Sequence, residues 1–224
     1  MRLRSSGIKP MIAIFDLDRT VTTQGTFTPW LFGFVRRQPW RVMALPVILI
    51  AVLAYILNLH TRKQLKQVML WCVVAGQSAE LVAEVNAAFI ALWVPRRCRP
   101  GALAAIAQHQ RQGDMVVLAT ASNDIYAVPI ARALGIEKVL ATRVEIGNDG
   151  RLTGRILGSN CYGPDKLAMV QAALGPIEGK AIVYSDHHSD WPLMVWAGEG
   201  VAVNPNGKLR QCASAQGMRI CDWR

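Results

Sequence analysis

The fold of this chain is decided by a stretch near its start, Met11-Ile-Ala-Ile-Phe-Asp-Leu-Asp-Arg-Thr20. Its first five residues form a continuous apolar run, which is typical of a parallel strand buried on both faces. Asp16 and Asp18 follow this run directly. Residues two apart in an extended segment point the same way, so both carboxylates are expected to face one site. The alternative role for Asp18 is to cap the N-terminus of a helix.

Beyond residue 100, segments that resemble strands alternate with segments that resemble helices. Apolar runs predict strands at 115–119, 139–141, 181–184 and 201–203. Helices are predicted at 101–112, 124–134, 165–174 and 192–197. Asn148-Asp149-Gly150 predicts a hairpin within residues 143–156. The alternation predicts an α/β fold with a doubly wound, mainly parallel, Rossmann-like sheet.

Residues 22–99 differ from the rest of the chain, because they contain long apolar helical runs and four of the seven tryptophans. The first strand belongs with the sheet formed after residue 100, so this segment is predicted to be an inserted helical cap. The expected domains are an α/β core of residues 1–21 and 100–224 and a cap of residues 22–99. The four tryptophans fit either the interior of the cap or a belt at a membrane interface.

The composition excludes several classes of protein. With 52% hydrophobic and 18% charged residues, the chain is too apolar to be disordered. Five scattered cysteines with no CxxC pair indicate neither a disulfide scaffold nor a structural zinc site. The apolar run 11–15 is too short for the hydrophobic region of a signal peptide, so a cytoplasmic location is predicted. The net charge of +10 favours an anionic partner.

The charge is concentrated in the cap. No acidic residue lies between Asp18 and Glu80, whereas that stretch contains seven basic residues: Arg19, Arg36, Arg37, Arg41, Arg62, Lys63 and Lys66. Residues 42–59 between them are uncharged and nearly all apolar. Basic clusters that flank an apolar run suit an anionic membrane surface. No Lys/Arg face interleaved with aromatic residues is visible, so no nucleic-acid partner is expected.

The apolar run 42–59 leaves two interpretations open. Its eighteen residues would span about 27 Å as a helix, which is just short of a hydrocarbon core of about 30 Å. A single transmembrane pass is topologically awkward, because both ends of the cap must return to one core. A re-entrant or interfacial helix pair avoids this difficulty, and so does a cap helix buried against its neighbours.

Polar side chains follow three of the predicted strands. Asp16 and Asp18 follow the first strand, Thr120 follows the second, and Asp186 and Asp190 follow the strand at 181–184. Ligands of open α/β sheets bind beyond the carboxyl ends of the strands, so these residues are expected to converge. Lys166 opens a helix in the same half of the chain. Oxygen ligands of this kind are those that Mg²⁺ prefers.

Two pairs of residues near these strand ends have simpler explanations. Ser122 and Asn123 precede a predicted helix, and capping that helix is the favoured role for both. His187 and His188 are adjacent, and adjacent residues rarely point at one metal. A loop role or a contact with the edge of the substrate is therefore favoured for them over a zinc site.

The ordered set Asp16-Leu-Asp18-Arg-Thr20, Thr120, Lys166 and Asp186…Asp190 resembles the four motifs of the haloacid dehalogenase (HAD) superfamily of phosphatases. The insertion of about eighty residues between the first two motifs resembles subfamily IB, which includes the phosphoserine phosphatase-like hydrolases. One departure is visible, because many members have Gly where this chain has Arg19. A similar Arg occurs in parts of subfamily IB, so the resemblance still implies an active phosphatase.

The resemblance implies a role for each motif residue. Asp16 is the expected nucleophile, which forms an aspartyl-phosphate, and Asp18 is the expected general acid and base. Asp16, the backbone carbonyl of Asp18, and Asp186 are expected to hold Mg²⁺. Asp190 is expected to reach the metal through water or to orient Lys166. Thr120 and Lys166 are expected to bind the phosphate oxygens.

The substrate is less closely defined. Arg36-Arg-Gln-Pro39 and the apolar run after it resemble bacterial phosphatidylglycerophosphatases of type C. This resemblance implies a membrane-lipid phosphate, such as phosphatidylglycerophosphate, and an enzyme peripheral to the cytoplasmic face of the inner membrane. One alternative is a phosphatase of a small soluble phosphomonoester, either phosphoserine-like or a sugar phosphate. Another is a non-catalytic phosphate-binding or membrane-adaptor protein, against which the complete motif set argues.

Overall fold

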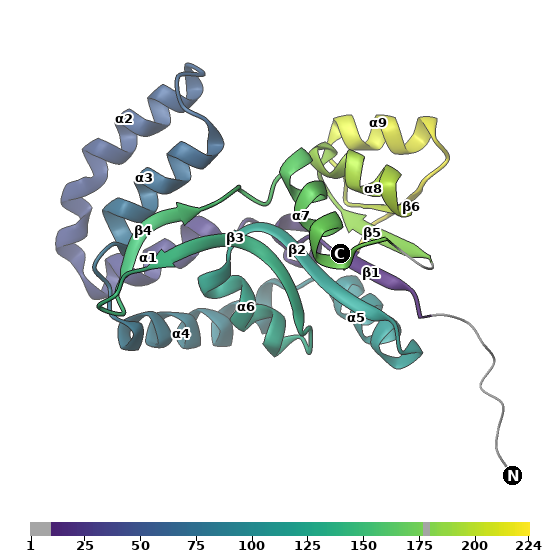
Figure 1. Cartoon of the computed structure of the whole chain (residues 1–224), viewed down its shortest axis with the longest axis horizontal. Helices are drawn as coiled ribbons and strands as arrows, with labels where there is room; N and C mark the ends of the chain where they lie inside the picture. The colour runs from purple at the N-terminus through teal and green to yellow at the C-terminus, as the bar shows by residue number, and fades with distance from the viewer. Residues whose placement is uncertain (1–9, 177–179) are drawn as a thin grey trace, which may run out of the picture.

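A seven-stranded sheet forms the centre of the computed structural model, which describes residues 10–176 and 180–224 (Figure 1). The strand order is β4-β3-β2-β1-β5-β6-β7, and every neighbouring pair is parallel except the antiparallel pair β3–β4. The strands are β1 (Ile12–Phe15), β2 (Met115–Asn123), β3 (Lys138–Ile146), β4 (Leu152–Leu157), β5 (Ala181–Ser185), β6 (Gly198–Val203) and β7 (Arg219–Cys221). The predicted mainly parallel α/β sheet is therefore confirmed.

Helices cover both faces of the sheet, as a doubly wound fold requires. They are α5 (Pro100–Gln112), α6 (Asp124–Ala133), α7 (Pro164–Leu174), α8 (Trp191–Ala197) and α9 (Gly207–Ala215). Successive residues of β1 point to opposite faces: Phe15 joins the core that includes α5 and α6, whereas Ile14 joins the core under α7, α8 and α9. Neither α9 nor the edge strand β7 was predicted from the sequence.

The segment between β1 and α5 is helical, as predicted. It contains α1 (Phe27–Arg37), the short turn η2 (Pro39–Ala44), α2 (Leu45–Ile56), α3 (Arg62–Val74) and α4 (Ala79–Arg97). The chain leaves and rejoins the sheet domain at one place, where Thr22 pairs with Cys98 and the Thr23 amide donates to the Arg97 carbonyl at 2.7 Å. The division into residues 1–21 with 100–224 and residues 22–99 stays a prediction, and this pairing supports it.

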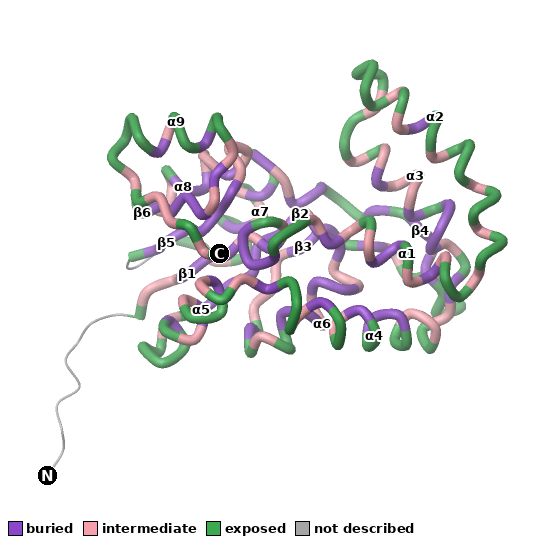
Figure 2. The backbone as a smooth tube through the Cα atoms, turned by 180° about the vertical axis from the view of Figure 1, so that it is seen from behind, coloured by how far each residue is buried: buried purple, intermediate pink, exposed green. Residues whose placement is uncertain are grey.

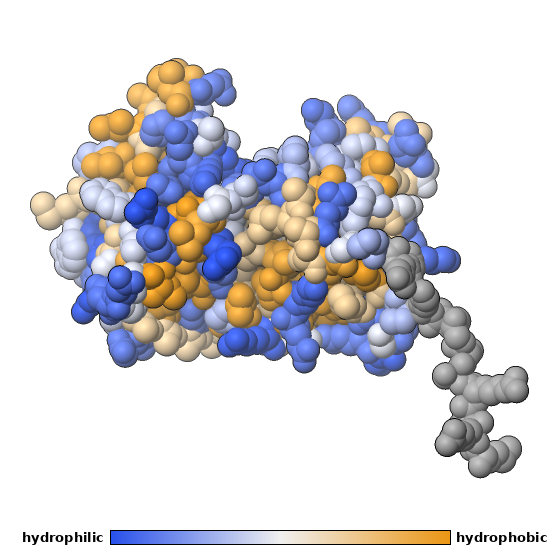
Figure 3. Space-filling model, in the orientation of Figure 1, coloured by the Kyte–Doolittle hydropathy of each residue, from blue (hydrophilic) through white to orange (hydrophobic). Residues whose placement is uncertain are grey.

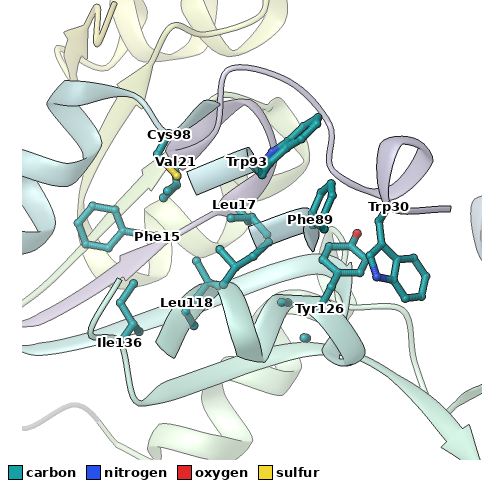
Figure 4. Close-up of a cluster of buried hydrophobic side chains, with 14 of the residues drawn as sticks. Phe15, Leu17, Val21, Trp30, Phe89, Trp93, Cys98, Leu118, Tyr126 and Ile136 are labelled. Atoms are coloured by element: carbon teal, nitrogen blue, oxygen red, sulfur yellow. The ribbon is translucent and has the colours of Figure 1, made fainter. Parts of the chain in front are cut away.

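The inserted helices share one hydrophobic core with the sheet. Trp30 of α1 lies 4.9 Å from the ring of Tyr126 of α6, and Phe89 of α4 lies 6.0 Å from that same ring. Figure 4 shows these side chains in one cluster with Phe15 and Leu118 of the sheet. The cap is therefore held to the core by apolar packing as well as by the paired chain crossing.

Helix α2 is the exception, because it is apolar and mostly exposed (Figure 2). The window Pro39–Ile56 has a mean hydropathy of 1.9 and only 6% of it is buried. By length and composition it is the one unbent helix in the described residues that could cross a membrane. Figure 3 shows hydrophobic surface gathered over α2. Of the two interpretations that the sequence left open, a cap helix buried against its neighbours does not describe this segment, and membrane association stays a prediction.

Two of the cap tryptophans are buried and two are exposed, so the cap interior accounts for only two of them, and a belt at a membrane interface stays a prediction for the other two. Trp30 and Trp93 are buried at 0% and 6% exposure, whereas Trp40 and Trp71 are each 63% exposed. The two buried rings belong to the core shared with the sheet. The two exposed rings lie on η2 and α3, the elements that adjoin α2.

The hairpin β3–β4 reaches from the sheet to the cap and packs against α3. Gly154 of β4 makes the closest approach, because a Cβ atom there would lie 2.8 Å from the Cα of Trp71. The backbone of Gly154 also has a positive φ of 78°, which favours glycine. The predicted turn at residues 148–150 lies at the tip of this hairpin, where the Gly150 amide bonds to the Gly147 carbonyl.

We expect Gly154→Ala to lower the free energy of unfolding by about 2–4 kcal/mol, from overpacking against α3 together with backbone strain. Gly150→Ala is the matched control, since Gly150 has a φ of 74° but no atom within 4 Å of the added Cβ. The control should lose only about 1 kcal/mol. Urea unfolding measures both variants, and equal losses would refute the importance of the contact with Trp71.

Candidate active site

The carboxyl end of β1 forms the floor of the site. The Asp16 amide donates to the Tyr184 carbonyl of β5 at 3.0 Å, so the chain is still paired with the sheet at this residue. A tight turn, η1 (Leu17–Val21), then reverses the backbone, and Arg19 within it has a φ of 66°. This positive φ is the physical reason why glycine suits the position. Arg19 occupies it at the cost of strain.

Lys166 lies where the carboxyl ends of β1 and β5 meet the start of α7. It lies in the first turn of α7, and its Nζ lies 2.8 Å from both Asp16 Oδ1 and Asp190 Oδ2. Ser185 at the end of β5 also donates to Asp190 Oδ2, at 2.7 Å. Burial acts to lower the pKa of Lys166, but the two carboxylates outweigh it and raise the pKa above its ordinary value. Lys166 is therefore a permanently charged centre at 2% exposure.

Thr20 brings Asp16 and Asp186 together. Its hydroxyl lies 3.4 Å from Asp16 Oδ2 and 3.3 Å from Asp186 Oδ1, and it accepts from the Asp186 amide at 2.9 Å. Burial raises the pKa of Asp16 to about 8 despite Lys166, and burial with Asp190 raises that of Asp186 to about 6. These carboxylates repel one another when they are ionised, and a bound cation would reduce that repulsion.

The donor set fits Mg²⁺ in part. In the described parts of the chain, no three His, Cys, Asp or Glu side chains are arranged to hold a metal. Mg²⁺ ordinarily takes one or two carboxylates and completes its shell with water and phosphate. Asp16 and Asp186 provide such a pair. The Oδ1 atom of Asp190 is buried without a hydrogen-bond partner in residues 10–176 and 180–224, which leaves it available to a metal-bound water.

The Asp18 carboxylate accepts hydrogen bonds from one residue of the cap and one residue of the sheet. Its Oδ1 accepts from the Thr26 amide at 2.8 Å and from the Thr26 hydroxyl at 2.6 Å, and its Oδ2 accepts from Ser122 Oγ at 2.9 Å. The capping role expected for Ser122 is therefore wrong. Asn123 occupies the N-cap position of α6 but makes no side-chain capping bond. Thr26 is a site residue that the sequence analysis missed, because its contact exists only in the folded chain.

Thr120 lies within β2, three residues before its end, and is fully buried. Its hydroxyl oxygen accepts from the Ser122 amide at 3.0 Å, and this bond does not use the hydroxyl proton. The side chain lines the same pocket as Asp16, Asp18 and Lys166. The structure therefore brings together all the residues that the sequence analysis selected, and their catalytic and metal-binding roles remain predictions.

These residues line a pocket of about 390 Å³ between the sheet and the cap. The cap contributes Phe27 and Thr28 from α1 and four residues from α3. His187 lies on the rim, where its Nδ1 bonds to the Ser189 hydroxyl at 2.9 Å, as expected for a loop role. Burial lowers the pKa of His187, so this ring is neutral at pH 7.

A doubly wound, Rossmann-like sheet with this lysine–carboxylate centre and a helical insertion after β1 defines a hydrolase of the phosphatase type. The chain belongs to the haloacid dehalogenase-like hydrolase family, whose model matches residues 13–195. The resemblance stated from the motifs is therefore confirmed, and the helical cap agrees with subfamily IB.

Curated relatives and a solved structure agree with this assignment. The chain is 27% identical over 202 residues to Protein CicA of Caulobacter vibrioides, with 86% of each chain covered. It is 28% identical over 156 residues to the histidinol-phosphatase of Neisseria meningitidis, covering 67% of this chain and 70% of that one. A protein of unknown function from Bordetella pertussis Tohama I superposes with a TM-score of 0.85 at 27% identity, covering 96% and 99% of the two chains.

We expect Arg19→Gly to raise the free energy of unfolding by about 0.5–1 kcal/mol. The strain of about 1–2 kcal/mol at a positive φ is removed, and the greater entropy of unfolded glycine offsets part of the gain. Asn58→Gly is the control, since Asn58 has a φ of 58° but asparagine tolerates this conformation. Thermal unfolding compares the two, and an equal shift in both would contradict strain at Arg19.

Proposed function

We propose that this protein is a Mg²⁺-dependent phosphomonoester hydrolase that acts through an aspartyl-phosphate on Asp16. The observation that carries the proposal is the buried Lys166 held at 2.8 Å from both Asp16 and Asp190 at the base of the pocket. A fixed positive charge beside a carboxylate attracts a phosphate to that carboxylate and stabilises charge on its oxygens.

The first step is attack of an Asp16 oxygen on phosphorus. The new bond to Asp16 forms as the bond between phosphorus and the leaving oxygen breaks. Asp18 in its protonated form donates a proton to that oxygen, which leaves as an alcohol. Thr120 and Lys166 donate hydrogen bonds to the non-bridging oxygens. The contacts of Asp18 with Thr26 and Ser122 keep its carboxyl group at a fixed position.

The second step returns the enzyme to its starting state. Asp18, now a carboxylate, removes a proton from a water molecule, and the resulting hydroxide attacks phosphorus. The bond between phosphorus and Asp16 breaks, inorganic phosphate is released, and Asp18 is left protonated for the next cycle. Asp16, Asp186 and the Asp18 carbonyl would hold Mg²⁺, whose charge reduces the repulsion between a carboxylate and an anionic phosphate.

We further propose that the substrate is a membrane-lipid phosphomonoester. The exposed apolar helix α2 supports this, because burial of its side chains in a bilayer would remove them from water. α2 adjoins α3, which lines the catalytic pocket. The second candidate is a small soluble phosphomonoester, which the similarity to the histidinol-phosphatase favours. Membrane binding distinguishes the two.

We expect Asp16→Asn to lower phosphatase turnover by at least about a thousandfold, because the attacking charge is lost while the size of the side chain is kept. The measurement is release of inorganic phosphate, together with loss of the acid-stable phosphate label on the protein. Asp165→Asn, a neighbour of Lys166 on α7, is the control and should keep its label. Turnover by Asp16→Asn within tenfold of the unsubstituted protein would disprove the mechanism.

Asp186→Asn and Asp190→Asn should fail in different ways. Asp186→Asn should raise the Mg²⁺ concentration for half-activation by at least about tenfold, because a direct ligand is lost. Asp190→Asn should lower the free energy of unfolding by about 3 kcal/mol, because the buried Lys166 loses one of its two carboxylates. Titration with Mg²⁺ after chelation and urea unfolding test the pair, and the reverse pattern would exchange the two roles.

We expect the triple variant Ile50→Gln, Leu53→Gln, Ile56→Gln to lose at least about 3 kcal/mol of binding to vesicles containing phosphatidylglycerol. These side chains are 68%, 56% and 66% exposed on α2. Leu103→Gln with Val195→Gln, on α5 and α8, is the control. Hydrolysis of a soluble phosphomonoester should stay unchanged in both variants. If the unsubstituted protein does not co-sediment with vesicles, the lipid substrate is excluded and the soluble one stands.

A further inference from the structure

A second pocket, of about 300 Å³, lies between α3 and β4. Helix α3 lines this second pocket with Gln64, Gln67, Val68 and Trp71. The same helix forms one wall of the catalytic pocket with Arg62, Leu65, Lys66 and Met69. With about 3.6 residues per turn, the two sets lie on opposite faces of α3. A ligand in the second pocket would therefore not touch the catalytic residues.

The two glutamines of the second pocket are available as hydrogen-bond donors. Gln64 Oε1 accepts from the Thr61 amide at 2.7 Å, and Gln67 Oε1 accepts from the Ile156 amide of β4 at 3.2 Å. Both carbonyl oxygens are thus used by the backbone. Within the described residues neither −NH2 group makes a hydrogen bond, and each has two N–H groups to donate.

The remaining polar side chains of the second pocket add a cation and further ring nitrogens. The Arg155 side chain is 73% exposed, and its Nε lies 3.9 Å from Glu145 Oε2, a loose pair that leaves its terminal nitrogens for a ligand. The indole of Trp71 can only donate. Nδ1 of His60 is buried without a partner in the described ranges, a cost that a ligand's hydrogen bond would remove. No Asp or Glu of the described chain lines this pocket, so its chemistry suits an oxygen-rich anion.

Apolar side chains adjoin the second pocket. Helix α3 lies between α2 and β4 (Figure 1), and the turn from α2 to α3 leads directly into His60. Leu57 and Leu59 in that turn are 58% and 72% exposed, and Trp71 on the pocket itself is 63% exposed. Tryptophan is enriched at the headgroup level of membranes. An inorganic anion makes no use of such an apolar border, whereas a phospholipid places a phosphate directly beside acyl chains.

We propose that the pocket between α3 and β4 binds the headgroup phosphate of an anionic phospholipid, with the acyl chains against the turn from α2 to α3. The phosphate accepts from the −NH2 groups of Gln64 and Gln67 and pairs with Arg155 through charge-assisted hydrogen bonds. This is a docking site and not a substrate site, because it lies on the face of α3 away from Asp16. The proposal goes beyond the proposed hydrolysis, and each can fail without the other.

The first test is titration with dihexanoylphosphatidylglycerol below its micelle-forming concentration. This soluble lipid is a phosphodiester, so a phosphomonoester hydrolase does not consume it. Nuclear magnetic resonance follows the side-chain amides of Gln64 and Gln67 and the indole of Trp71, and we expect saturable shifts of these signals. Glycerophosphoglycerol, which is the headgroup without acyl chains, should bind at least about tenfold more weakly.

Two comparisons can overturn the assignment of the occupant. Dihexanoylphosphatidylcholine has the same chains and a zwitterionic headgroup, and it should also bind more weakly than the anionic lipid. Equal binding of the two lipids would exclude recognition of an anionic headgroup. Binding of glycerophosphoglycerol or inorganic phosphate as tight as that of the anionic lipid would make a soluble anion the occupant. An absence of shifts with all four compounds would exclude the site itself.

Substitution of Gln67 tests the donors directly. Gln67→Glu keeps the oxygen that accepts from the Ile156 amide, but it replaces the −NH2 donor by an acceptor that repels an anion. We expect the affinity for dihexanoylphosphatidylglycerol to fall by at least about tenfold. Gln108→Glu adds the same charge at an exposed position of α5 and should change the affinity by less than about twofold.

Arg155→Gln is the second variant, and Arg143→Gln, an exposed arginine of the same hairpin, is its control. Only Arg155→Gln should weaken binding of the anionic lipid. Hydrolysis of a soluble phosphomonoester and the circular dichroism spectrum should be unchanged in all four variants, which shows that each is folded. Unchanged affinity in both pocket variants, or equal losses in the pocket variants and their controls, would overturn the proposal.

Discussion

The structure depends on a buried lysine that must be matched by two carboxylates. An ammonium at 2% exposure is unfavourable unless its charge is compensated, and its partners Asp16 and Asp190 come from distant parts of the chain. Only the strand order that places β1 beside β5 brings them together. The same requirement assembles the proposed phosphate site, so fold stability and the proposed chemistry rely on one contact.

The sheet and the motif residues could be predicted because their signals are local. Buried parallel strands are continuous apolar runs, and the residues after them necessarily meet at one edge of the sheet. The strand β7 could not be predicted, since Arg219-Ile-Cys221 is too short and polar to stand out. The contacts of Asp18 with Thr26 and Ser122 were missed for another reason. They join residues 8 and 104 positions apart, and only the folded chain creates them.

The cap shows a second limit of sequence reasoning. Its basic residues form one group in the sequence, and we interpreted them together as a membrane-facing cluster. The fold separates these basic residues, because they lie on different faces of the cap helices. Arg41 donates to the Cys72 and Ala75 carbonyls and fastens η2 to α3, Lys66 enters the pocket wall, and Arg36 stays exposed. The sequence left a membrane-facing helix and a buried cap helix open for the apolar run, and α2 is mostly exposed because its apolar side chains lie on all of its sides.

The shared core limits how the pocket can admit a substrate. The chain crosses between cap and sheet domain at the single paired position Thr22–Cys98, which by itself would suit a hinge. However, rotation about that point would pull Trp30 and Phe89 away from Tyr126 and expose these rings to water. The helices α1 and α4 therefore act as a fixed frame. The pocket wall on α3 packs against α2, so a surface that touches α2 would lie one helix away from the pocket.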